Sequence, residues 1–216
     1  MVKRNSVAAS AAAPRGRRAI QAEQTRTDIV DAARRQFAAT GYAGTSIKDI
    51  AAAAGVSVQT VYDSVGSKAD LVRRLNDLID ADADVGEIAR TIPDTADPLE
   101  VARIPALIAR RIVERCGDIL RTCFDGARAE PDLLPVVDEG GRRHRAGARR
   151  IAERLAALDA LDPGVSIDDA AVTIATVADY RVAMLLIDDH EYTLDQVEDW
   201  MAATIARTVL RSPPDA

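Results

Sequence analysis

The chain has 216 residues, of which 48% are hydrophobic and 29% are charged, so it can bury a full core in one or two domains. Aromatic residues make up only 3%, and no alternating strand pattern with turn signals occurs, which favours an all-α protein. No apolar run approaches the ~20 residues of a membrane span, and residues 1–20 lack the apolar core of a signal peptide. We therefore expect a cytoplasmic protein that does not contact a membrane.

The net charge of −6 divides unevenly along the chain. Residues 1–75 contain 12 Lys and Arg against 6 Asp and Glu, whereas residues 76–216 contain 16 against 28. A basic segment is attracted to the phosphates of DNA and an acidic segment is repelled by them. The first third of the chain is therefore the part expected to bind nucleic acid.

The chain begins with a segment rich in Ala and Ser that carries five cations and no acid over residues 1–20. This composition predicts a disordered basic arm, which either follows DNA phosphates or only keeps the protein soluble, and the sequence leaves both roles open. Beyond it, Ile29, Ala33 and Phe37 recur every four residues and predict the first helix, which Gly41 ends.

Two short helices separated by a tight turn are predicted next. The first has four apolar residues at the spacing of one helix face: Ile47, Ile50, Ala51 and Ala54. Gly55 follows directly and permits the left-handed backbone of a tight turn, and Ser57 is positioned to cap the second helix. This order of features is that of a helix-turn-helix, whose second helix enters the major groove of DNA.

The same stretch resembles the DNA-binding domain of the TetR family of transcriptional regulators. The resemblance extends over about residues 23–71 and rests on Gly41-Tyr42, Thr45-Ser46, Ile50-Ala51, Ala54-Gly55-Val56-Ser57, Thr60-Val61-Tyr62 and Ser67-Lys68. It implies an all-α fold, with a three-helix helix-turn-helix domain at residues 21–67 and a helical ligand-binding and dimerisation domain at residues 68–216. The family often has an aromatic pair where this chain has residues 63–66, so base preference is not inherited.

The candidate DNA-binding residues lie at the starts of these helices and on the outer side of the second one. They are Thr45, Ser46, Ser57, Val58, Gln59, Thr60, Tyr62 and Lys68. Base reading is assigned to Val58, Gln59 and Thr60. Lys68 falls in the first turn of a helix, where its charge opposes the helix dipole, and a bound phosphate would reverse that cost. Asp63 is expected to face an arginine or solvent.

The remainder of the chain is predicted to be helical apart from a loop at residues 84–97. The expected helices span residues 68–83, 98–116, 118–128, 133–158, 166–188 and 194–210. Pro105 should kink the second of these and open space beside the core. The candidate ligand-binding residues are Leu107, Arg111, Leu120, Cys123, Phe124 and Tyr180, although apolar residues at this spacing also fit a plain core.

Further chemistry is not expected. Cys116 and Cys123 are about 10 Å apart along one predicted helix and are explained as small buried residues. His190 has acidic neighbours, but consecutive residues rarely converge on one ion. The basic run at residues 142–150 is explained as a solvated face paired with carboxylates. We expect no catalytic residues, no metal and no cofactor.

The sequence predicts a homodimeric transcriptional regulator, most simply a repressor that a small-molecule effector releases from a palindromic operator in double-stranded DNA. The resemblance implies that the last two helices form the homodimer interface. Two alternatives stay open: a DNA-binding module without an effector, and a small-molecule carrier or enzyme that has kept a vestigial helix-turn-helix.

Overall fold

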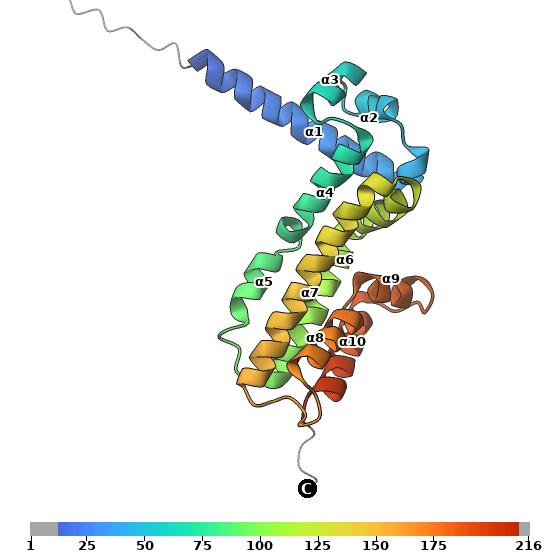
Figure 1. Ribbon diagram of the computed structural model, residues 1–216. Helices are drawn as coiled ribbons and strands as arrows, with labels where there is room; N and C mark the ends of the chain where they lie inside the picture. The colour runs from blue at the N-terminus through green and yellow to red at the C-terminus, as the bar shows by residue number, and fades with distance from the viewer. Residues whose placement is uncertain (1–12, 212–216) are drawn as a thin grey trace, which may run out of the picture. The chain divides into compact units, whose positions relative to one another are not determined.

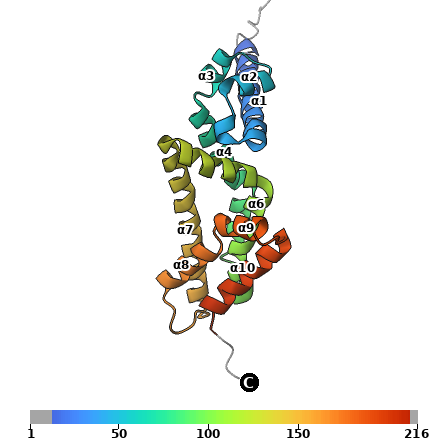
Figure 2. The same cartoon turned by 90° about the vertical axis from the view of Figure 1, so that its right-hand side faces the viewer.

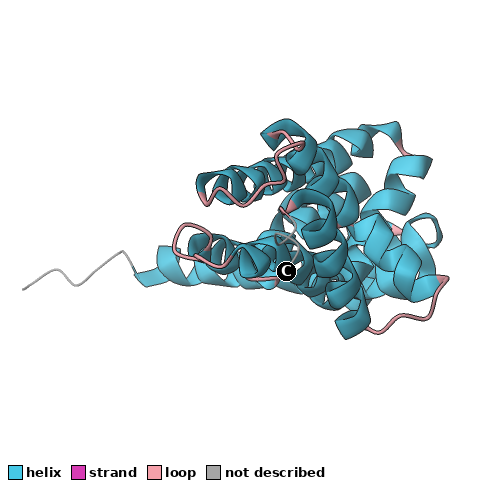
Figure 3. Cartoon of the chain, turned by 90° about the horizontal axis from the view of Figure 1, so that it is seen from below, coloured by secondary structure: helices cyan, strands magenta, loops and turns pink. Residues whose placement is uncertain are grey.

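The computed structural model describes residues 13–211, with side chains from residue 16 onward (Figure 1). Within this range the secondary structure is helical apart from one isolated antiparallel bridge between Leu161 and Leu210 (Figure 3). The all-α prediction is confirmed. The chain forms two compact units, Met1–Leu71 and Val72–Ala216, so the division falls after Leu71 rather than after residue 67.

The N-terminal unit contains three helices and the start of a fourth: α1 (Ala13–Gly44), α2 (Ile47–Ala53), α3 (Val58–Ser64) and α4 (Lys68–Asp82). Gly41 interrupts α1 with φ 72° and ψ 170°, at the residue predicted to end the first helix. The expected disordered arm is wrong over residues 13–20, because its Ala and Arg residues are strong helix formers that extend α1. Residues 1–12 of that arm lie outside the described range.

The core of this unit comes from α1, α2, α3 and the first turn of α4. Its largest fully buried side chains are Ile29, Tyr42, Ile50, Val61 and Leu71. Val65, 8% exposed, closes the end of α3, in the place where the family often has an aromatic residue. The predicted apolar faces therefore meet as expected.

The C-terminal unit contains the rest of α4 and six further α-helices. They are α5 (Val85–Thr91), α6 (Pro98–Ala129), α7 (Leu134–Ala157), α8 (Ile167–Val177), α9 (Tyr180–Asp188) and α10 (Leu194–Val209), with a short 3-10 turn, η1 (Pro131–Leu133), before α7. The long α6 packs against both α7 and α10, and α7 packs against α8 (Figures 1 and 2). One apolar core therefore runs between α6, α7, α8 and α10.

Two expectations for residues 84–128 are wrong. The predicted loop at residues 84–97 contains α5, because Ile88 and Ile92 are one turn apart and bury against α6. The two helices predicted over residues 98–128 are one helix, α6, which continues through Pro105 and Gly117. Asp84, directly before α5, forms ion pairs with arginines of α6 and so holds the two helices together.

The helix predicted over residues 166–188 is two helices, α8 and α9. Asp179 interrupts it with an extended backbone, and its carboxylate accepts a hydrogen bond of 2.8 Å from the Arg181 backbone amide, which starts a new helix. The segment Ile167–Asp188 is long and apolar enough to span a membrane by composition. Since Asp179 breaks it and α8 packs against α7 and α10, it is explained as core structure of this unit.

A buried carboxylate joins α6 to α10. Glu198, 5% exposed, accepts hydrogen bonds from Arg103 at 2.7 Å and from Arg110 at 2.9 Å. The same arginines extend outward to Asp199 and Asp195 on α10. Because two cations surround one buried acid, the pairing fixes how α10 lies along α6.

Candidate DNA-binding surface and ligand cavity

The turn between α2 and α3 has the geometry that the sequence predicts. Gly55 has φ 68°, and the amide of Val56 donates to the carbonyl of Ala51 at 3.0 Å, which closes the end of α2. The Ser57 hydroxyl accepts a hydrogen bond of 3.0 Å from the Thr60 amide and so caps α3. The two helices form a helix-turn-helix.

The start of α2 is closed by a reciprocal pair of hydrogen bonds. The Asp49 amide donates to the Ser46 hydroxyl at 3.2 Å, and the Ser46 amide donates to the Asp49 carboxylate at 3.1 Å. Hydrogen bonds from the side chain and backbone of Ser46 lower the pKa of Asp49 below its ordinary value. Ser46 remains exposed, at the outer end of α2.

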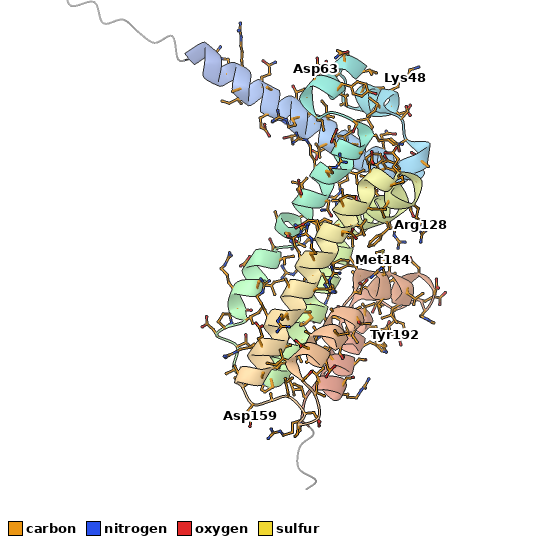
Figure 4. The ribbon with its side chains drawn as sticks, in the orientation of Figure 1. Lys48, Asp63, Arg128, Asp159, Met184 and Tyr192 are labelled. Atoms are coloured by element: carbon orange, nitrogen blue, oxygen red, sulfur yellow. The ribbon has the colours of Figure 1, made fainter. Side chains whose placement is uncertain are left out.

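The outer side of α3 presents a short row of polar and apolar tips. Val58 is 40% exposed and Tyr62 is 50% exposed, and Gln59 beside them is exposed as well. The Gln59 amide donates to Asp63 at 2.8 Å, so Asp63 faces solvent and a glutamine rather than an arginine. In Figure 4 the labelled Asp63 extends from α3 to the outside of the unit. The exposed row suits entry into a groove of DNA.

The structure does not bring Thr45 to the surface. Thr45 is 3% exposed, and its hydroxyl donates to the Gly41 carbonyl at 2.8 Å and meets the Thr40 hydroxyl at the same distance. These bonds bridge the break in α1. Thr45 is therefore a structural residue of the turn, and its expected role at DNA is wrong because the hydroxyl is used internally.

Lys68 has an internal role that the sequence did not predict. Its ammonium donates to the carbonyls of Tyr42 at 3.0 Å and Thr45 at 3.2 Å, and lies 4.0 Å from the centre of the Tyr42 ring. The ammonium thus satisfies two carbonyl groups that follow the break in α1 at Gly41. Two of its three N–H donors are used here, which leaves one for a phosphate.

A further cation lies in the helix-turn-helix. Lys48, the second residue of α2, is exposed, and Figure 4 shows its side chain extending outward. The sequence analysis overlooked it. The signal was available, since a lysine one residue into a capped helix can reach an anion held at that helix start.

The C-terminal unit contains two cavities lined entirely by residues after Leu71. The larger has a volume of about 610 Å³ and lies among α4, α5, α6, α7 and α8, whereas the second measures about 460 Å³ and lies among α4, α6, α7, α8 and α9. Both volumes are in the range that encloses a small organic molecule. Five residues line both cavities: Asn76, Leu120, Gly140, His144 and Tyr180. We call these five residues the junction.

Four of the six predicted ligand-binding residues line the cavities. Leu120 and Tyr180 line both, and Cys123 and Phe124 line the second. The other two do not. Leu107 packs into the core, and Arg111 forms an ion pair of 3.0 Å with Asp84. Cys116 and Cys123 are both buried, and neither forms a disulfide among the described residues.

Burial is the main cause of the pKa shifts of Cys123 and Tyr180 in the cavity walls. It raises the pKa of the Cys123 thiol to about 12, so the thiol stays protonated and unreactive at neutral pH. Burial, with the charges of Asp179 and Asp80, also raises the pKa of the Tyr180 hydroxyl to about 12. The walls therefore disfavour negative charge beside Tyr180.

Three polar residues of the cavity walls were not predicted from the sequence. Asn76 on α4 is 6% exposed. His144 places Nε2 2.8 Å from the Ala175 carbonyl, and Arg143 forms an ion pair of 2.7 Å with Asp80. His144 and Arg143 belong to the basic run that was explained as a solvated face; Arg149 does pair with Glu153 and Asp168 on the surface. The run thus has both a solvated side and a side that lines the cavities.

This fold and this surface define a helix-turn-helix DNA-binding protein with a separate helical domain that contains cavities. Residues 29–75 match the model of the family described as bacterial regulatory proteins, tetR family. The N-terminal domain is accordingly a TetR-family DNA-binding domain.

Individual relatives agree with this assignment. The chain is 37% identical over 83 residues to the HTH-type transcriptional regulator TtgR of Pseudomonas putida, and the match covers 38% of this chain and 40% of TtgR. It thus spans less than half the length of the curated relatives.

Solved structures resemble nearly the whole chain. The complex of SmeT with triclosan has a TM-score of 0.69 at 19% identity, and the similarity covers 87% of this chain and 92% of SmeT. FadR of Bacillus subtilis in complex with stearoyl-CoA has a TM-score of 0.66 at 18% identity, covering 83% of this chain and 97% of FadR. At these identities the likeness establishes the fold of both units.

Proposed function

We propose that this protein is a transcriptional regulator that binds a palindromic operator as a homodimer and is released from it by a small-molecule effector. The observation that carries the proposal is the capped α3 of a TetR-family domain, with Val58, Gln59 and Tyr62 exposed along one side. In this proposal it acts without catalysis, as a repressor in the cytoplasm.

Base reading is assigned to Val58, Gln59 and Thr60, because their short side chains lie on the first turn of α3, which enters the groove first. Contacts to the DNA backbone are assigned to the exposed hydroxyls and cations around them: Ser46, Lys48, Ser57, Tyr62 and the remaining donor of Lys68. These contacts position the protein without selecting a sequence.

The homodimer interface is assigned to α8 and α10. Three large apolar side chains on these helices are exposed in one chain: Val172 at 67%, Trp200 at 37% and Ile167 at 36%. A two-fold dimer would cover them and would place two copies of α3 on half-sites one turn apart. Replacing Val172 with Arg should convert the dimer to a monomer in analytical ultracentrifugation and abolish operator binding, while the helical circular dichroism spectrum is retained.

Effector control is favoured over a DNA-binding module without an effector because of the two cavities. A cavity of about 610 Å³ beside α4 is more than a packed core leaves unfilled. The structurally similar SmeT and FadR have been solved with triclosan and stearoyl-CoA. A library of apolar compounds should therefore contain molecules that raise the melting temperature of this protein.

The decisive experiment is selection of bound sequences from random double-stranded DNA. The proposal expects enrichment of a palindrome whose half-sites are about one helical turn apart, with binding that weakens steeply with salt. Gln59→Ala should change the preferred bases, whereas Lys48→Ala should weaken binding to all sequences alike. If no sequence is enriched, the chain is not a sequence-specific regulator and the vestigial alternative holds.

A further inference from the structure

The junction between the two cavities contains a buried amide whose hydrogen bonds are unused. Asn76 is 6% exposed and lines both cavities. Within residues 16–211 its side-chain amide forms no hydrogen bond, and the amide atoms are accessible from the cavities rather than sealed in the core. An asparagine offers two N–H donors and one carbonyl acceptor, which remain available to a group inside the cavities.

The side chain of Asn76 faces α7 across the junction. Its Oδ1 faces Gly140 of α7, where a Cβ, if one were present, would lie 3.9 Å away. A glycine at this position keeps the space in front of the amide open. The amide is thus directed into the space that connects the two cavities.

A second polar group faces the same space. The Tyr180 hydroxyl also lacks a hydrogen-bond partner among the described residues, although its ring lies 5.1 Å from the ring of His144. His144 is held in turn by its contact with the Ala175 carbonyl. Tyr180 and Asn76 therefore both offer hydrogen-bond donors and acceptors to the two cavities, whose remaining walls are mainly apolar.

Two pairs of opposite charges adjoin the junction. Asp80 pairs with Arg143 at 2.7 Å, and Asp179 pairs with Arg181 at the same distance. Arg90 and Arg150 line only the larger cavity, and Asp138 and Arg145 line only the second, so these four residues are outside the junction. None of the five junction residues is an acid, a lysine or an arginine, so the junction itself favours an uncharged group.

We propose that the junction recognises an uncharged group that both donates and accepts hydrogen bonds, such as a hydroxyl or a carboxamide, on a ligand whose apolar body extends into the cavities. This inference rests on the proposed effector cavity and names its ligand chemistry. Asn76 and Tyr180 supply the hydrogen bonds, and the residues of the apolar walls supply the remaining contacts.

The test uses three probes of nearly equal size that compete with the neutral dye N-phenyl-1-naphthylamine for the full-length protein. They are 1-decanol, its isomer 1-methoxynonane, which accepts hydrogen bonds but does not donate them, and decanoate. Decanol should bind about tenfold more tightly than the ether, because the ether leaves at least one donor–acceptor pair unmade.

Two variants locate the selectivity. Asn76→Leu and Tyr180→Phe should each remove most of the preference for decanol over the ether while the dye still binds. Leu107→Met, which changes a core residue outside the cavities, should leave the preference intact. Equal preference in Asn76→Leu and the parent protein, or tighter binding of decanoate than of decanol that depends on Asn76, would overturn the inference.

The outcome separates this inference from the proposed function. If the dye and all three probes fail to bind the folded protein, the effector cavity itself is absent and the proposed function loses its ligand. If they bind without discriminating hydroxyl from ether, effector control survives and only the chemistry proposed for the junction fails.

Discussion

The ammonium of Lys68 lies 4.0 Å from the centre of the Tyr42 ring and donates to the Tyr42 carbonyl at 3.0 Å. One lysine at the start of α4 is thereby tied to the residue that follows the break in α1. Tyr42 in turn stacks against Phe37, with ring centres 5.7 Å apart. The lysine that the sequence presents as a DNA contact also stabilises the domain that holds the reading helix.

Replacing Lys68 with Met should lower the free energy of unfolding of the N-terminal unit by about 1–2 kcal/mol, because two charge-assisted hydrogen bonds and a cation–π contact are lost. Lys48→Met is the matched control, since Lys48 is exposed and should leave stability unchanged. Chemical denaturation followed by circular dichroism measures both. Equal stability of the two variants would show that Lys68 has no structural role.

Asp63 is the exposed acid beside the proposed reading side of α3. Asp63→Asn should strengthen binding to DNA of any sequence at low salt and have less effect at high salt, because it removes repulsion from phosphates. An asparagine keeps a carbonyl oxygen that can accept from the Gln59 amide, so base preference should stay unchanged. Titrations of random and selected duplexes over a range of salt concentrations check both effects, and a salt-independent change would contradict the electrostatic cause.

Gly140 gives a way to close the cavities without touching the DNA-binding unit. Gly140→Leu should fill the junction and abolish binding of N-phenyl-1-naphthylamine, while binding to selected DNA stays at the parent level. Gly140→Ala is the control: its Cβ would have 3.9 Å of clearance, and it should stabilise α7 by roughly 0.5–1 kcal/mol without loss of the dye. Dye binding by the leucine variant would show that the dye binds elsewhere.

Glu198 is the buried acid that two arginines of α6 surround. Glu198→Gln should lower the free energy of unfolding by about 2 kcal/mol, because both arginines lose their buried charged partner and keep only the exposed Asp199 and Asp195. Asp195→Asn, in the same network but with a side chain 76% exposed, should change it by less than about 0.5 kcal/mol. Thermal unfolding of both variants distinguishes a buried pair from a surface pair.

Asp179 makes a predictable contribution to stability as a function of pH. Burial alone would raise its pKa, but hydrogen bonds from the side chain and backbone of Arg181 outweigh burial and hold the pKa below its ordinary value. A lowered pKa in the folded state gives stability that is complete above the unfolded pKa of about 3.9 and is lost as the pH falls through the folded value.

Asp179→Asn keeps a capping side chain but removes the charge. The parent should be more stable than this variant at neutral pH, and the difference should disappear in acid below the folded pKa of Asp179. Melting temperatures measured from neutral pH down to about pH 2 check the sign. A difference that persists in acid would mean that Arg181 does not stabilise the ionised carboxylate.

Local chemistry explains why the helix-turn-helix was predictable. Gly55 can take a positive φ and Ser57 can cap a helix whatever the rest of the chain does. The turn and the helix start can therefore be predicted from adjacent residues alone. Lys68 was half predicted. The position of Lys68 at a helix start can be predicted from neighbouring residues. Its hydrogen bond to the Thr45 carbonyl joins residues 23 positions apart, and no sequence pattern indicates that contact.

The cavities could not be predicted in the same way. Their shape depends on two turns without glycine: Asp84, which takes φ 54° and starts α5, and Asp179, which separates α8 from α9. The break at Asp84 was predicted as the start of a loop, but the helix that follows it was not. A single aspartate in an apolar pattern is more often a surface residue, so the break at Asp179 is not visible in the sequence. Asn76 and His144 likewise look like solvated positions until the fold brings α4 and α7 to the walls of the same cavities.

Both cavities are lined only by residues after Leu71, and every residue proposed to touch DNA comes before it. Under the proposed function, the specificity for a compound and the specificity for an operator would therefore be encoded in separate stretches of the gene. We expect substitutions at Asn76, Gly140 or Tyr180 to change which compound is bound while the selected DNA sequence stays the same. Such a protein can be adapted as a biosensor one half at a time.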